Sequence, residues 1–91
     1  MTHETLTAIA PEEVVRRARE FFLHRVPATG AFVEGESARH IVLRGQGGEE
    51  LVIAAVARGG GSAVRGSTLL FDQQIRRFFS TLPPAAGAGS A

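Results

Sequence analysis

The side chains that could do chemistry in this chain are few and widely spaced. There is no cysteine and no lysine, and the three histidines are His3, His24 and His40. No two of these histidines are four residues apart, the spacing that would bring them together on one helix face. A zinc site needs three or four converging ligands, so we predict no metal ion and no cofactor.

Asp72 is the only aspartate of the chain. General acid–base catalysis and the Ser-His-Asp arrangement both need a second group placed beside the first, and no spacing here indicates one. We interpret Asp72 as a helix-start residue, with Ser67 and Thr68 as candidate capping residues. The chain is therefore predicted not to be an enzyme, although His40 and Asp72 would be the first residues to mutate if it were.

Two glycine clusters, at 45–48 and 59–62, could suggest phosphate-binding loops. A P-loop requires a Gly-Lys-Ser/Thr sequence and a helix that starts directly after it. The chain has no lysine, and β-prone segments follow both clusters. Hairpin turns, where glycine supplies a positive φ, are the better interpretation.

Length and composition predict one domain over 1–84 and a flexible Ala/Gly/Ser tail over 85–91. The net charge of +1 gives no strong positive field for nucleic acid. The longest apolar run, 51–57, is far shorter than the roughly 20 residues that span a bilayer. With no basic, apolar leader at the N-terminus, we expect no membrane association and a cytoplasmic location.

Apolar spacing predicts two amphipathic helices, and alternating or β-prone segments predict five strands. The helices are expected over 11–25 and 71–82, and the strands over 5–10, 31–34, 38–44, 50–58 and 63–68. Five of the six phenylalanines fall on the helices, so the main core should lie between helices and sheet. The predicted fold class is α+β, with a single antiparallel sheet in the order β-α-β-β-β-β-α and both helices on one face.

Two segments carry a resemblance to a known family. The strand followed by Ala-Pro-Glu-Glu-Val (10–14) resembles the opening of helix-grip domains of the START/polyketide-cyclase type, and 70–83 resembles their C-terminal helix. The element order is also similar to one half of a TBP-like fold. Helix-grip domains have more strands and enclose an apolar cavity beneath the C-terminal helix. The resemblance therefore implies a ligand pocket lined by Phe32, Ile75 and Phe79.

The segment 50–58 is apolar at both odd and even positions. Two helices can cover only one face of a sheet, and a face that meets water is usually polar. One explanation is a central strand whose small alanines expose little area. The other is an interface with a second chain, formed by Val42, Val52, Ala54 and Val56.

These patterns leave several functions open. The leading hypothesis is a non-enzymatic interaction or assembly domain, either a homo-oligomer or an accessory subunit bound to a partner protein. The alternative is a carrier or sensor of a small apolar ligand. Nucleic-acid binding would use the strand arginines 39, 44, 58 and 65, but aromatic side chains for base stacking are scarce and nearby glutamates favour ion pairs instead.

Overall fold

Five antiparallel strands form one sheet in the spatial order β1-β5-β4-β3-β2. The computed structural model describes residues 1–25, 32–45 and 47–85. The strands are β1 (Thr2–Thr7), β2 (Phe32–Glu36), β3 (His40–Arg44), β4 (Glu50–Arg58) and β5 (Gly61–Thr68). Two α-helices, α1 (Pro11–Glu20) and α2 (Asp72–Ser80), and a π-helical extension of α1, η1 (Phe21–Arg25), complete the described fold.

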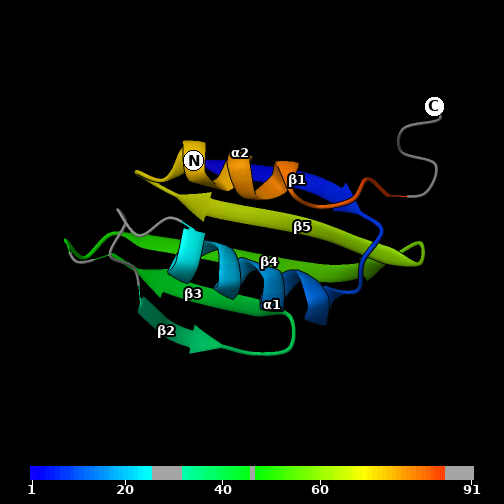
Figure 1. Cartoon of the computed structure of the whole chain (residues 1–91), viewed down its shortest axis with the longest axis horizontal. Helices are drawn as coiled ribbons and strands as arrows, with labels where there is room; N and C mark the ends of the chain where they lie inside the picture. Colours follow the sequence, from blue (N-terminus) through cyan, green and yellow to red (C-terminus); the bar gives the residue numbers. More distant parts are fainter. Residues whose placement is uncertain (26–31, 46, 86–91) are drawn as a thin grey trace.

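Both helices lie on the same face of the sheet (Figure 1). Helix α1 crosses β3, β4 and β5, whereas α2 lies over β1 and β5. The predicted α+β class, with one antiparallel sheet and two helices on one face, is therefore confirmed. The opposite face of the sheet carries no described element (Figure 1).

The core fills the layer between the helices and the sheet. Phe22 and Phe78 are almost fully buried, and each ring centroid lies 5.5 Å from the other, so α1's extension and α2 meet through aromatic contacts. On the sheet side, Gly66 allows Ile75 to approach closely, because a Cβ at Gly66 would lie 2.9 Å from Ile75 Cγ2. Helix α2 thus rests directly on β5.

Helix α1 begins as predicted, with Pro11 at its first turn and Glu12 and Glu13 near its positive end. It continues into a π-helical turn at Phe21–Arg25, so the predicted helix over 11–25 is present with a widened last turn. In the described residues, no helix has the length and apolar character needed to cross a membrane.

The glycine clusters form hairpin turns, as predicted. Gly59 and Gly60 both have positive φ and make the two-residue turn between β4 and β5, while Gly48 has a φ of 90° before β4. Because the turn is only two residues long, β5 begins at Gly61 rather than at the predicted residue 63.

The first strand was predicted in the wrong place. The prediction put it at 5–10, but β1 covers Thr2–Thr7 and the chain bends before Pro11. Threonines at positions 2, 5 and 7 and a pairing with β5 over its whole length favour the earlier register. Its position at an edge of the sheet agrees with the prediction.

The segment after α2 returns to β1. Thr7 Oγ1 donates a hydrogen bond to the Pro83 carbonyl at 2.6 Å, and the Ala8 amide donates to the same carbonyl at 3.2 Å. This fastens the chain up to Pro84 against the domain. Of the tail predicted over 85–91, only Ala85 lies within the described residues. Ala31, the predicted start of the second strand, lies outside them, and β2 begins at Phe32.

Candidate functional site

The face of the sheet opposite the helices is the candidate site. Side chains alternate between the two faces of a strand, and the buried Ile41, Leu51 and Ile53 point toward the helices. Their neighbours in sequence therefore point the other way. We call this surface the open face; its residues are Thr2, Glu4, Leu6, Phe32, His40, Val42, Arg44, Val52, Ala54, Val56, Arg58, Ala63, Arg65 and Ser67.

The four residues predicted as an interface all lie on the open face. Val42 pairs with Val52 across β3 and β4, and Ala54 and Val56 follow along β4. Val56 is 57% exposed, and the other three are partly exposed. The helices cover none of them, so the apolar side chains of β4 on this side meet solvent in the single chain.

The open face is hollowed near its β1 edge. A shallow hollow of about 660 Å³ has Ala54 and Ala63 among its lining residues, and Leu6 and Val56 stand on either side of Ala63 in the strand register. The hollow exists because Ala54 and Ala63 have small side chains, and the longer side chains of Leu6 and Val56 form part of its border. A projecting apolar side chain from another molecule could fill this space.

Charged side chains frame the apolar part of the open face. At one side, Arg65 Nη2 lies 3.0 Å from Glu4 Oε2. At the other, Arg44 Nε lies 2.7 Å from Glu34 Oε2, and Arg44 Nη2 lies 3.3 Å from Glu50 Oε2. Hydrogen bonding to Arg44 lowers the pKa of the Glu34 carboxyl from its ordinary value of 4.5.

The sequence predicted that glutamates near the strands would pair with the arginines. This is confirmed for Arg44 with Glu34 and Glu50. Arg65 is also paired, but its partner is Glu4 on β1. Arg58 borders the hollow, and Arg39 immediately precedes β3. The arginines of the open face thus do not form a uniformly positive row.

Phe32 is separated from the other two residues of the predicted ligand pocket, Ile75 and Phe79, which are four residues apart on α2. Phe32 is half exposed and pairs with Arg44 at the β2 edge of the sheet. Ile75 is fully buried under α2 at the other side of the sheet, and Phe79 contacts Phe78. The close approach of Ile75 to Gly66 fills the space between α2 and β5.

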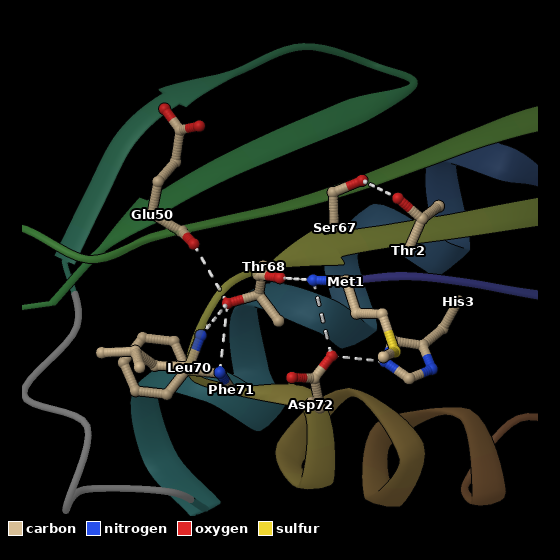
Figure 2. A network of polar contacts seen from close by, with 9 residues as sticks. All are labelled: Met1, Thr2, His3, Glu50, Ser67, Thr68, Leu70, Phe71 and Asp72. Atoms are coloured by element: carbon tan, nitrogen blue, oxygen red, sulfur yellow. Dashed lines mark hydrogen bonds and ion pairs between the residues drawn. The ribbon is translucent and has the colours of Figure 1, made fainter.

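A polar cluster that the sequence did not predict joins β1 to α2 (Figure 2). His3 Nε2 lies 2.6 Å from Asp72 Oδ1, and the N-terminal ammonium group lies 3.7 Å from the same oxygen. The hydrogen bond from His3 lowers the pKa of Asp72 below its ordinary value of 3.8, and the N-terminal charge lowers it further against the opposing effect of desolvation.

Thr68 completes the cluster (Figure 2). Its hydroxyl donates to the Glu50 carbonyl at 3.1 Å and accepts from the Leu70 and Phe71 amides at 3.3 and 3.1 Å. Its carbonyl accepts a hydrogen bond from the N-terminal ammonium group. Thr68 therefore shapes the turn before α2, and Ser67 lies on the open face beside Thr2. The prediction of either residue as the helix cap was wrong, because Phe71 holds the capping position and no side chain caps α2.

The His3–Asp72 pair resembles the orienting half of a catalytic dyad, but the contacts around it join two elements of the fold. The hollow at this end of the sheet is lined by Met1, Thr2, Glu50, Ser67, Thr68 and Leu69, and includes neither partner. The pair joins the first strand to the last helix across 69 positions of sequence. We interpret it as a tether between these two elements.

The other two histidines lie elsewhere. His40 is exposed at the start of β3, and its Nδ1 is hydrogen-bonded to the Ser37 hydroxyl. His24 is exposed, with its Nε2 3.9 Å from Glu20 Oε2. His40 and Asp72 lie on opposite faces of the sheet. Over residues 1–25, 32–45 and 47–85, no three histidine or carboxylate side chains gather as a metal site.

Comparisons with known proteins give no significant match to a family model, to a curated protein or to a solved structure. The arrangement of this surface is therefore the basis for any functional proposal. An apolar strip with a hollow and paired charges at its sides is suited to contact with another protein surface.

Proposed function

We propose that this chain is a protein-interaction domain whose open face docks a partner chain. The observation that carries the proposal is the exposed apolar side of β4, from Val52 to Val56, on the face that the helices leave uncovered. Monomeric proteins seldom expose contiguous apolar surface without a binding role. A single exposed valine would need no such explanation, but the partly exposed Val52 and Ala54 continue the apolar strip from Val56 along β4, and Val42 lies beside Val52 on β3.

The framing charges support a protein partner over nucleic acid. Phosphate binding requires arginines that are free to exchange counterions for phosphates. Arg44 and Arg65 instead contact glutamates on neighbouring strands. An apolar centre with a polar, balanced rim is the usual organisation of a protein–protein interface.

Docking also compensates for the small size of the domain. A chain of about this length buries only ~60–65% of its unfolded surface. Covering Val56 and its neighbours would add apolar burial, at roughly 25 cal/mol for each Å² removed from water.

Site-specific photocrosslinking in the cells that naturally produce this chain tests the proposal. A photoreactive residue at position 56 should give an adduct with one recurring polypeptide, either the same chain or another. The matched probe at Gln73, exposed on α2, should not give that adduct. Excess wild-type domain should compete the adduct away, and a Val52→Glu variant should compete poorly.

Two results would count against this function. Equal protein adducts from positions 56 and 73 would show that the open face is not a preferred contact. A bound small molecule in the native mass spectrum, with no protein adduct at position 56, would favour the carrier hypothesis.

A further inference from the structure

We propose that the partner on the open face is a second copy of this chain, stacked face to face with the first. The two copies are related by a two-fold axis that is parallel to the strands and lies above the open face, midway between β1 and β5. This inference rests on the proposed docking function and names its partner. A two-fold interface uses the same surface twice, so each feature must face its own complement. The open face meets this requirement in three consecutive rows.

The first row is electrostatic. Glu4 and Arg65 are directly opposite each other in the β1–β5 register, and their side chains are 65% and 64% exposed. A two-fold axis between these strands places Glu4 of each copy against Arg65 of the other. The four charges then alternate in sign, whereas a row of one sign would repel its own copy.

The second row is steric. Leu6 and Ala63 are also directly opposite in the register, two residues further along β1. Leu6 projects, with 44% of its surface exposed, while Ala63 lines the hollow. The same axis lays Leu6 of each copy over Ala63 of the other, so that a large side chain meets the hollow twice.

The third row is polar and neutral. Thr2 and Ser67 are paired in the register, and their hydroxyl oxygens lie 3.4 Å apart. The axis puts hydroxyl against hydroxyl, and each group can donate or accept. Val52 and Val56 lie on β4, one strand beyond the overlap, and Val56 borders the hollow that Leu6 of the other copy enters.

These three rows favour a second copy over an unrelated protein. A surface that binds a different protein can be complementary to that protein without being complementary to itself. Here each charge, each bulky side chain and each small one lies beside its complement on the adjacent strand, as an isologous contact requires. Sheets that pack face to face do so with their strands nearly aligned, which an axis along the strands permits.

Sedimentation equilibrium of the full chain, from about 1 μM to 1 mM, tests the proposal. The wild type should show a monomer–dimer equilibrium. Glu4→Arg and Arg65→Glu should each weaken the dimer by about tenfold or more, because each creates two like-charge contacts across the axis. Glu20→Arg is the matched control, since Glu20 is 62% exposed on the helix-covered side, and it should leave the dimer unchanged.

Mixing the two single variants gives the decisive measurement. One variant chain carries two positive charges on this row and the other carries two negative ones, so a mixed dimer regains both ion pairs. An equimolar mixture should therefore associate about as strongly as the wild type. The double variant Glu4→Arg/Arg65→Glu should also dimerise, and it serves as the test if a single variant fails to give the far-UV circular dichroism of the folded domain.

A wild type that stays monomeric at every concentration would overturn the second copy. It would leave the docking function to the crosslinking experiment at position 56, which detects any protein partner. A wild-type dimer unaffected by either charge reversal, or single variants whose mixture stays monomeric, would overturn the two-fold arrangement.

Discussion

Replacing Gly61 with alanine should be among the most damaging small substitutions in this domain. Gly61 is the first residue of β5, directly after the hairpin turn. A Cβ added there would lie 2.0 Å from the Thr7 carbonyl oxygen and 3.0 Å from Ala8 Cα. Both are backbone atoms, so no side-chain rotation can relieve the contact.

The backbone near Thr7 has little freedom to move away. The Thr7 hydroxyl and the Ala8 amide both bind the Pro83 carbonyl, and the Ser62 hydroxyl donates to the Ile9 carbonyl at 2.7 Å. Overpacking costs about 1–3 kcal/mol, and each hydrogen bond lost in the adjustment costs about 1 kcal/mol. We therefore expect Gly61→Ala to lower the free energy of unfolding by about 3 kcal/mol.

Urea unfolding followed by far-UV circular dichroism measures this change, since the chain has no tryptophan or tyrosine for fluorescence. With a urea m-value of about 1–1.5 kcal/mol/M for a small domain, the midpoint should fall by about 2–3 M. Gly35→Ala is the matched control: an added Cβ there has no atom within 4 Å, and the midpoint should move by less than about 0.5 M. A Gly61→Ala midpoint equally close to the wild type would refute the reasoning.

Three further outcomes are expected. Phe78→Ala should cost about 3–5 kcal/mol in urea unfolding, because Phe78 is fully buried against the Phe21 and Phe22 rings, whereas the same change at half-exposed Phe32 should cost less than about 1 kcal/mol; equal losses would contradict this packing. The Asp72 carboxylate has a folded-state pKa below its ordinary value of 3.8, so it stabilises the fold above that value and loses this effect as pH falls through the lowered pKa. The difference in unfolding free energy between wild type and Asp72→Asn should accordingly shrink as pH falls below about 3.8, and a constant difference would exclude the tether. Hydrogen bonds from Arg16 and then Arg17 bring the pKa of Glu13 to about 2 from its ordinary 4.5, so its carboxyl ¹³C resonance should titrate near that value and move toward 4.5 in Arg16→Gln.

Local sequence patterns were sufficient to predict most of the elements. Helix α2 follows from the spacing of Phe71, Ile75 and Phe78, and β4 from an apolar run bounded by glycine turns. The predicted position of β1 was displaced because the segment 5–10, with Leu6 between two threonines, has the local pattern of a short strand. Its true position depends on pairing with β5, a contact between residues about 60 positions apart that no local pattern encodes.

The candidate site was predicted in part for the same reason. Alternation along β3 and β4 places Val42 and Val52 on one face once the sheet is assumed, and the structure agrees. Arg65 was predicted to lie on a strand, but its pairing with Glu4 and the contribution of Leu6 were missed because they depend on the β1–β5 register. The His3–Asp72 contact was missed as well. A correct placement of β1 would have indicated it, because His3 then lies on the helix-covered face of the sheet.

The strand order has a consequence for how this chain folds. Strands β2 to β5 are joined by successive hairpins, so they can assemble through contacts between sequence neighbours. Among the described strands, β1 pairs with β5 alone, and closing such a long loop is slow compared with forming a hairpin. During synthesis, β1 leaves the ribosome first and is the last strand able to find its place. Until β1 arrives, β5 is an unpaired edge open to the same strand of another chain, so we expect this topology to favour exchange of β1 between molecules when folding fails.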